Sequence, residues 1–320
     1  MPLAATMPEQ ETVSTISARG LSRSFGNHVA VKDLSLELRR GEVLGFLGPN
    51  GAGKTTTMQM LTGNLAPSRG TISICGIDLL DEPVRAKARV GYLPEVPPLY
   101  RELTVNEYLT LAARLHRVPS ARRPDAVAAA RQRCGLADVG GRLIGALSKG
   151  YRQRVGIAQA IVHAPDIVIL DEPTAGLDPN QIREIRGLIR ELGGAHSVIL
   201  STHILPEVEA ICDRVQIMHH GNLVYSDTIA ALKQFESGAT VLVGLRRPPP
   251  LAELAAVPGV AAAECVESTL YRVQFAAGED STDALVKQAA ARDWGLYQLK
   301  PAQTTLEDVF VNLTRREEST

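Results

Sequence analysis

Residues 48–55 read Gly-Pro-Asn-Gly-Ala-Gly-Lys-Thr, a complete G-x-x-x-x-G-K-[ST] phosphate-binding loop. The apolar run Val43–Leu47 before it predicts a buried parallel strand, and Lys54–Leu61 after it predicts a helix. Such a loop works between a strand and a helix, because its backbone N–H groups surround phosphate oxygens and the helix N-terminus adds partial positive charge. The stretch therefore predicts a nucleoside triphosphate site.

Two side chains of this loop carry specific chemistry. We expect Lys54 to reach the β- and γ-phosphates and the Thr55 hydroxyl to ligate Mg²⁺. The alternative, a glycine-rich turn with a surface lysine, is disfavoured by the strand and the helix on either side. The remaining residues that we expect to bind the nucleotide here are Gly48, Pro49, Asn50, Gly51, Ala52, Gly53 and Thr56.

A second apolar strand, residues 168–170, ends in a pair of acids, Asp171 and Glu172. We expect Asp171 to hold Mg²⁺, in part through water. Glu172 alternates to the other side of the strand, where it can polarise the water that attacks the γ-phosphate. Such general-base catalysis contributes ~10²–10⁴ in rate. Two acids that merely cap a strand are the alternative interpretation, which a nearby phosphate loop disfavours.

Residues 147–153, Leu-Ser-Lys-Gly-Tyr-Arg-Gln, open an amphipathic helix for which Ser148 is a suitable N-cap. The Ser148 hydroxyl and the Gly150 N–H at this helix start form a second anion site. Nothing in the same domain is an obvious ligand for it. Capped helices are common, so the stretch is weak evidence when taken alone.

In their order along the chain, these motifs resemble those of ABC ATPases, and the resemblance covers roughly residues 15–235. The chain looks like the nucleotide-binding subunit of an ABC transporter. This resemblance implies an α/β P-loop NTPase fold with a helical insert, and ATP hydrolysis coupled to transport. It rests on Phe25, the loop 48–55, residues 148–153, Asp171-Glu172-Pro173-Thr174, Ala175-Gly176-Leu177-Asp178 and Ser201-Thr202-His203.

The resemblance gives roles to further residues. Phe25 matches the aromatic that stacks on adenine, although such stacking tolerates other bases and leaves GTP open. A core phenylalanine is the alternative. His203 matches the switch histidine that contacts the γ-phosphate, so Lys54, Glu172 and His203 are the expected catalytic residues.

The same resemblance implies a second copy of the chain as partner. Asp178 matches the loop that runs across to the other subunit. In the family, the signature helix of one subunit covers the ATP held by the other. Two copies are therefore expected to sandwich two ATP molecules, with Ser148 and Gly150 contacting the γ-phosphate across the interface.

Two positions depart from the family pattern. Glu95 stands where the family has a glutamine that ligates Mg²⁺ and relays to the membrane partner. A glutamate still offers an oxygen ligand, but its charge at ~4 Å from another charge, with an effective dielectric of ~20, adds about 4 kcal/mol of repulsion near the triphosphate. Mg²⁺ can offset this repulsion, so the sequence leaves open whether turnover is slower or more metal-dependent, and activity is expected to persist. The signature also has Lys149 and Tyr151 where glycine and glutamine are commonest.

Composition bounds the class of protein. The 320 residues carry a net charge of −1, which disfavours a nucleic-acid partner, and the four cysteines show no C-x-x-C spacing. No apolar stretch approaches ~18 residues, and residues 1–15 lack the features of a signal peptide. We therefore expect a cytoplasmic subunit, peripheral on the cytoplasmic face of the inner membrane, that works with a separate integral-membrane permease.

Periodicity predicts a flexible tail over residues 1–15, an ATPase domain over 16–235 and an accessory domain over 236–320. A helical insert is expected over 104–164, and alternating strands and helices predict a mostly parallel sheet. The exposed stretch 96–100 lies where the family receives the coupling helix of the membrane subunit; an ordinary proline-rich loop is the alternative.

The C-terminal part follows another pattern. Strand, helix, strand, strand, helix and strand over residues 240–300 suggest a small ferredoxin-like α+β domain, and residues 305–310 open a last helix. This ending resembles subunits of type-2, exporter-like ABC systems, including the gliding-motility, nitrous-oxide-reductase-maturation and drug-resistance groups. By fold-level analogy, we expect a role in dimer contact or regulation.

The sequence is also compatible with other functions of an ABC ATPase. The chain can serve as a mechanical or regulatory module of a membrane complex. A non-transporter ABC ATPase is disfavoured, because the chain has one ATPase domain and no heptad run. The transported solute cannot be predicted, since in such systems the membrane partner mainly recognises it.

Overall fold

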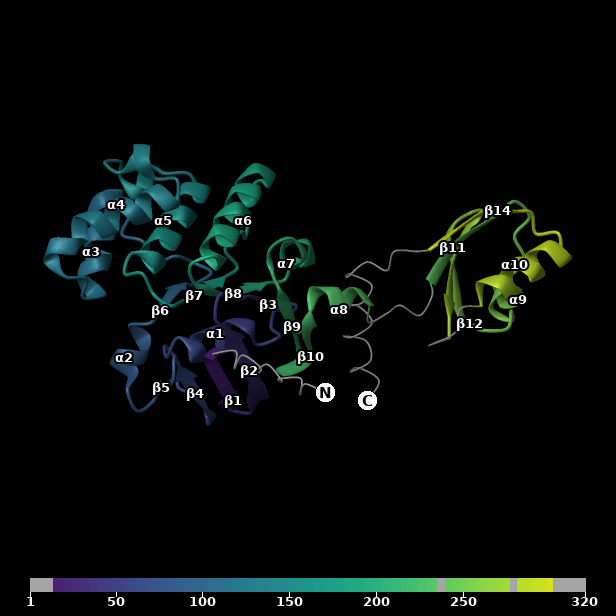
Figure 1. Ribbon diagram of the computed structural model, residues 1–320, viewed down its shortest axis with the longest axis horizontal. Coiled ribbons are helices and arrows are strands. Elements are labelled where there is room, and N and C mark those ends of the chain that lie inside the picture. Colours follow the sequence, from purple (N-terminus) through teal and green to yellow (C-terminus); the bar gives the residue numbers. More distant parts are fainter. Residues whose placement is uncertain (1–13, 235–239, 277–280, 302–320) are drawn as a thin grey trace, which may run out of the picture. The chain divides into compact units, whose positions relative to one another are not determined.

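The computed structural model of the chain describes residues 14–234, 240–276 and 281–301 (Figure 1). It divides into two compact units, Met1–Asp227 and Thr228–Thr320. Most of the expected N-terminal tail lies outside the described residues. The first strand begins at Ser14, two residues earlier than expected, because the buried Thr15 hydroxyl donates a hydrogen bond to the Leu38 carbonyl (3.1 Å).

The first unit is organised around a six-stranded sheet with the order β10-β9-β3-β8-β7-β6. The strands from β9 to β6 run parallel, which confirms the predicted mostly parallel sheet. Strands β3, β7 and β8 are buried along their whole length, and this burial explains their near-continuous apolar sequences. The bounds are β3 (Val43–Leu47), β6 (Val90–Leu93), β7 (Ile167–Asp171), β8 (Ser197–Thr202), β9 (Arg214–His219) and β10 (Asn222–Thr228).

A smaller antiparallel sheet covers one side of this unit, in the order β2-β1-β4-β5. Helix α1 (Lys54–Leu61) follows the phosphate loop and shares one buried cluster with both sheets, including Ile16, Phe46, Met58 and Ile169. The helix that begins at the loop is thereby fixed by apolar packing between the two layers. The strands are β1 (Ser14–Phe25), β2 (His28–Arg39), β4 (Arg69–Ile74) and β5 (Ile77–Asp78).

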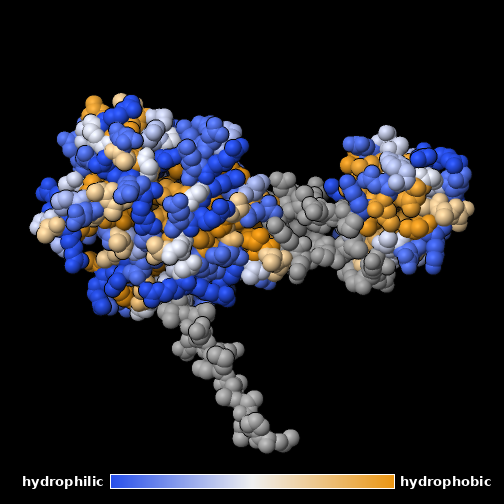
Figure 2. Space-filling model, turned by 45° about the horizontal axis from the view of Figure 1, so that its top comes forward, coloured by the Kyte–Doolittle hydropathy of each residue, from blue (hydrophilic) through white to orange (hydrophobic). Residues whose placement is uncertain are grey.

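The helical insert packs on the other side of the large sheet, where its buried residues form a second cluster with strand residues such as Leu170 and Val198. Its first two helices are separated by a short turn that begins at Pro119. Hydrophilic residues cover much of the visible surface of the first unit, with hydrophobic ones exposed among them (Figure 2). The helices of this unit outside α1 are α2 (Pro83–Lys87), α3 (Val105–Leu115), α4 (Arg123–Arg133), α5 (Lys149–Ile161), α6 (Pro179–Gly193) and α7 (Leu205–Ile211).

The second unit has its own four-stranded antiparallel sheet, in the order β12-β13-β11-β14, and its own buried cluster, which includes Val243, Phe275 and Trp294. From β11 to β14 the elements follow one another in the predicted order. The last helix that was expected from residue 305 lies outside the described residues. The elements are α8 (Ile229–Gln234), β11 (Thr240–Leu245), α9 (Leu251–Ala255), β12 (Val260–Glu267), β13 (Leu270–Phe275), α10 (Thr282–Ala291) and β14 (Leu296–Pro301).

Candidate nucleotide-binding site

A cavity of about 460 Å³ lies where β3, β7 and β8 end, the edge at which open parallel sheets bind ligands. Residues far apart in the sequence meet there, because parallel strands bring their carboxyl ends to one edge. Ten of the residues expected at the site line this cavity: Phe25, Asn50, Gly51, Gly53, Lys54, Thr55, Thr56, Glu95, Glu172 and His203.

The phosphate loop is held closely on one side and open on the other. A Cβ at Gly53 would lie 2.4 Å from the Ala30 carbonyl oxygen, and one at Gly48 would lie 2.4 Å from that of Met218. Gly51, at φ 81°, has open space where a side chain would be. The loop therefore needs glycine both for its packing against β2 and β9 and for its left-handed turn.

Lys54 is buried within the loop that it ends. Its Nζ donates hydrogen bonds to the carbonyl oxygens of Gly48 (2.7 Å) and Pro49 (3.2 Å). The same Nζ lies 3.6 Å from Oε1 of Glu172. The ammonium group is thus placed between the loop and the end of β7, on the wall of the cavity.

Glu172 has a conformation that its sequence did not predict. Its φ of 48° lies in the left-handed region, which costs a non-glycine residue about 1–3 kcal/mol and is often found at functional sites. The backbone N–H donates to the Ser201 carbonyl (2.9 Å). The carboxylate oxygens lie 2.9 and 3.0 Å from Nδ1 of His203, whose ring is about half exposed.

Asp171 is fully buried beside the cavity but does not line it. Among the described residues, no hydrogen-bond donor pairs with either carboxylate oxygen. Burial raises the pKa of Asp171; the nearby hydroxyls of Ser201 and Thr55 act in the opposite direction, and the carboxylates of Glu172 and Glu95 raise it further. A buried carboxylate in this setting is a strong candidate for a cation ligand.

Phe25 lies at the end of β1 with 48% of its surface exposed, and the Arg23 guanidinium stands 4.9 Å from its ring centroid. A core role, the alternative that the sequence left open, does not fit this exposure. The ring is available to stack on a flat ligand in the cavity that it lines.

Three expected site residues lie away from this cavity: Ser148, Gly150 and Asp178. The exposed Ser148 caps α5 by accepting a hydrogen bond from the Tyr151 N–H (3.4 Å), and the exposed Asp178 caps α6. A Cβ at Gly150 would lie 2.6 Å from the Gln181 side chain, so the two helix starts are neighbours. Gly48, Pro49 and Ala52 support the loop without lining the cavity.

Comparisons with known proteins decide the family. The family model described as ABC transporter matches residues 31–175. YxlF, an ABC transporter ATP-binding protein of Bacillus subtilis, is 40% identical over 219 residues, which are 68% of this chain and 72% of YxlF. This chain belongs to the ABC transporter ATP-binding proteins. The family predicted from the sequence is therefore confirmed.

The ABC subunit also resembles two proteins named for transport. It is 38% identical over 211 residues to the bacitracin transport ATP-binding protein BcrA of Bacillus licheniformis, covering 65% of this chain and 68% of BcrA. It is 33% identical over 310 residues to the Nod factor export ATP-binding protein I of Burkholderia orbicola, covering 96% and 99%. The solved structure of an ATP-binding subunit of an ABC transporter matches 69% of this chain and 92% of its own, with a TM-score of 0.63 and 32% identity.

As a member of this family, the ABC subunit binds ATP and hydrolyses it to power a transporter. The P-loop NTPase fold of its first unit is confirmed by the solved relatives. None of the helices that the structure describes is long and apolar enough to span a bilayer.

The sequence assigned no role to several residues around the cavity of the ABC subunit. His28, Ala30 and Ala175 line it, and the buried Ser201 hydroxyl lies near Asp171. Ala175 opens the motif of residues 175–178 and Ser201 opens that of residues 201–203, so both motifs were usable signals. His28 enters through the hairpin between β1 and β2, and no motif marks it.

Proposed function

We propose that this ABC ATPase homodimerises around two Mg-ATP molecules and drives a separate membrane permease, in the direction of export. The single observation that carries the proposal is the cluster of Lys54, Glu172 and His203 around one cavity beside the phosphate loop. Export is supported by the full-length similarity to a subunit named for Nod factor export. The permease selects the transported solute.

In this proposal the three clustered side chains share the chemistry. Lys54 binds the β- and γ-phosphates with donors that its ammonium group directs into the cavity. Glu172 orients and deprotonates the attacking water, and the nearby His203 positions that carboxylate and contacts the γ-phosphate. The left-handed φ of Glu172 supports this role, because it places the carboxylate next to both other residues.

The residues around the loop fit Mg²⁺. Asp171, Thr55 and Glu95 offer carboxylate and hydroxyl oxygens, the ligands that this cation prefers, and both Asp171 oxygens are free of protein donors among the described residues. Within the described part of the chain, no three His, Cys, Asp or Glu side chains are arranged to hold a metal ion. Mg²⁺ would therefore bind together with phosphate oxygens, whose charge it offsets.

The base of the nucleotide would stack on Phe25, which is half exposed at the cavity wall. Stacking on a phenyl ring does not distinguish adenine from guanine. The family supports ATP as the nucleotide.

The dimer is supported by three expected site residues that do not line the cavity of their own chain. Ser148, Gly150 and Asp178 lie on neighbouring helix starts, and the two capping residues are exposed. Both helix starts point partial positive charge toward solvent, where a γ-phosphate held by a second copy can bind. Two copies arranged symmetrically would complete both sites.

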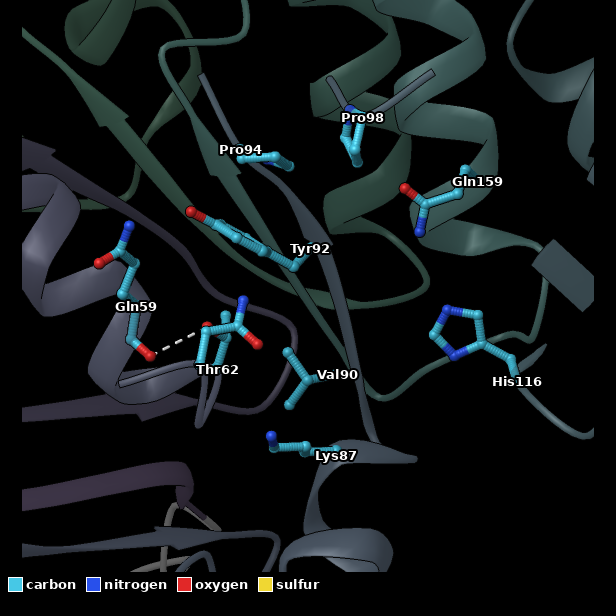
Figure 3. Close-up of a pocket in the computed structure, with 10 residues that line it drawn as sticks. Gln59, Thr62, Lys87, Val90, Tyr92, Pro94, Pro98, His116 and Gln159 are labelled. Carbon is cyan, nitrogen blue, oxygen red and sulfur yellow. Dashed lines mark hydrogen bonds between the residues drawn. The ribbon is translucent and has the colours of Figure 1, made fainter. Parts of the chain in front are cut away.

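We further propose that the permease docks at a second cavity, of about 410 Å³, between α1, β6 and the insert (Figure 3). Tyr92 lies in its middle, with Gln59 of α1 and the C-cap residue Thr62 on one side and His116 and Gln159 on the other. Pro94 and Pro98 line this second cavity, whereas Glu95 between them lines the nucleotide cavity. Residues 94–98 can thereby transmit movement between permease and nucleotide.

The remaining proposals concern organisation. We propose an ATPase domain over residues 16–235 and a ferredoxin-like accessory domain over 236–320, supported by a sheet in which the two central strands are the first and third of the four. We also propose that the subunit lies on the cytoplasmic face of the inner membrane, as a permease partner requires. Dimer contact or regulation is the proposed role of the accessory domain.

The test is to purify the Glu172→Gln chain from its native membranes in mild detergent with Mg-ATP and to identify co-purifying proteins by mass spectrometry. The proposal expects a multi-span membrane protein at near one-to-one stoichiometry. Lys54→Ala, prepared in parallel, should capture much less of it, because it cannot hold ATP and close. A homodimer that repeatedly lacks any membrane protein would favour a non-transporter ATPase.

A further inference from the structure

A third cavity, of about 470 Å³, lies on the helical insert between α3 and α4, apart from the nucleotide and docking cavities. Its wall combines two arginines with hydroxyl and amide groups and contains no carboxylate. The lining residues are Asn106, Thr110, Ser120, Arg123, Pro124, Val127, Ala128 and Arg131. We call this cavity the arginine groove.

Both arginines of the groove are held in place by the backbone. Nε of Arg123 donates to the Val118 carbonyl (2.8 Å), and Nη2 of Arg131 donates to the Ala137 carbonyl. Because each guanidinium is anchored through one nitrogen, its other N–H groups keep a defined direction. Less side-chain freedom is then lost when a ligand binds.

Arg131 and Asn106 converge at Gly140. A Cβ built on Gly140 would lie 2.5 Å from Cζ of Arg131 and 2.8 Å from Oδ1 of Asn106, so both side chains reach the same glycine. Nε of Arg131 is buried and has no hydrogen-bond partner among the described residues. Nε is therefore closed to a ligand, and the terminal N–H groups of Arg131 that are not bonded to Ala137 are the ones that can donate to a phosphate oxygen.

The arginines also lack the partners that usually neutralise them. No carboxylate in the described part of the chain lies within ion-pair distance of Arg123 or Arg131. Residues 101–142 contain eight arginines against four carboxylates, a net charge of +4, whereas the whole chain carries −1. The positive charge of the chain is therefore concentrated on the insert, and the groove lies within it.

We propose that the arginine groove binds the phosphate of anionic membrane lipids and so holds the helical insert against the bilayer surface. Charge complementarity carries the proposal: two unpaired guanidinium groups and three neutral polar side chains face a ligand rich in phosphate oxygens. This lipid-binding proposal rests on the proposed function in one respect: the permease partner brings the chain to a membrane.

The test uses the purified full-length chain, without permease, in vesicle flotation at low salt. Vesicles of phosphatidylcholine alone are compared with vesicles that also contain phosphatidylglycerol. Wild type should float only with the anionic vesicles. Loss of a hydrogen bond to a charged group lowers affinity by about tenfold or more, so Arg123→Gln and Arg131→Gln should each lower binding about tenfold, and the double variant by about 100-fold.

Arg122→Gln is the matched control, because it removes the same charge from the neighbouring exposed position, outside the groove. It should lower vesicle binding clearly less than Arg123→Gln. Equal losses would mean that a diffuse positive field, and not the groove, attracts the lipid, and would overturn the assignment. Equal flotation of wild type with neutral and anionic vesicles would also overturn it.

Two further measurements separate the sources of failure. Isothermal titration with inorganic phosphate tests for a free anion: binding of phosphate that the two groove variants abolish, without vesicle binding, would reject the lipid. Mg-ATP turnover and thermal unfolding of each variant should match wild type, so a loss of flotation cannot reflect misfolding. Because the assay contains no permease, a negative result leaves the proposed function intact.

Discussion

The expected site residues of the core and those of the helical insert differ in whether they line the nucleotide cavity. In the core, Glu172 lies within contact distance of both Lys54 and His203, and all three line a single cavity. On the insert side, the exposed Ser148 caps the start of α5 and lines no part of that cavity. The difference fits the proposed dimer, in which each core holds its own nucleotide and the insert of the other chain completes the site.

The largest expected effect tests the core. Lys54→Ala removes the ammonium donors beside the phosphate loop, and each hydrogen bond to a charged group is worth about 1.5–3 kcal/mol. The ammonium group carries three such donors, so ATP affinity, measured by fluorescent nucleotide titration, should fall by ~10³–10⁵-fold. Lys287→Ala, at an exposed position of α10 in the second unit, is the control and should bind normally. Unchanged affinity of Lys54→Ala would refute the core site.

Glu172→Gln separates binding from turnover within the core. The amide keeps the shape of the side chain but cannot accept the proton of the attacking water, so steady-state ATP hydrolysis should fall by ~10²–10⁴ while ATP binding persists. The matched control is Glu191→Gln, an exposed residue of α6. Near-normal turnover of Glu172→Gln under saturating Mg-ATP would show that another group acts as the base.

Ser148→Asp probes the insert half alone. Aspartate is as good an N-cap as serine, so α5 should stay intact, but its charge would repel a γ-phosphate held by a second chain by about 4 kcal/mol at ~4 Å with an effective dielectric of ~20. We expect loss of the ATP-dependent dimer in analytical ultracentrifugation, with monomer nucleotide affinity retained. Ser148→Asn keeps the cap without the charge. If Ser148→Asp dimerised like wild type, this helix start would not face the partner's nucleotide.

The smallest expected effect lies where the insert joins the core. The rings of His116 and His163 stack at a centroid distance of 3.7 Å, and burial lowers the pKa of both, that of His163 to about 4. In the unfolded chain the pKa is near 6.5, so only the unfolded state takes up the proton as the pH falls below that value. Stability is therefore full above about pH 6.5 and declines by up to about 3 kcal/mol toward pH 4.

Urea unfolding across this pH range measures the effect. His163→Gln cannot titrate, so its midpoint should depend less on pH between 6.5 and 4 than that of wild type. The two chains should differ least in slope above pH 7, where both histidines are neutral in either state. An identical pH dependence of wild type and variant would mean that the stacked pair does not govern acid stability.

Much of the fold could be predicted because it depends on local patterns. Continuous apolar runs marked β3, β7 and β8, and Ser148 marked the start of α5, since burial on both faces and helix capping are visible in consecutive residues. The order of strands and helices in the second unit could be predicted in the same way from its short strand and helix patterns. The start of β1 at Ser14 was missed, because the hydrogen bond of Thr15 joins residues far apart in sequence.

At the candidate site, too, local motifs could be predicted and long-range contacts could not. Motifs placed Lys54, Glu172 and His203 near one another, since parallel strands bring their ends together. Their mutual contacts, the carbonyl partners of Lys54 and the entry of His28 depend on tertiary packing that no motif encodes. The arginine groove was likewise invisible, because Asn106 and Arg131 converge only after α3 and α4 pair.

The left-handed backbone at Glu172 has an evolutionary consequence. Any L-residue with a side chain carries a conformational penalty of about 1–2 kcal/mol at this φ, which glycine would avoid. Glycine would relieve that penalty but would also leave the buried Lys54 ammonium without its carboxylate neighbour, and removing one partner of a buried ion pair costs about 3–5 kcal/mol. Selection for stability alone should therefore keep an acidic side chain at this position, even in a lineage that no longer transports.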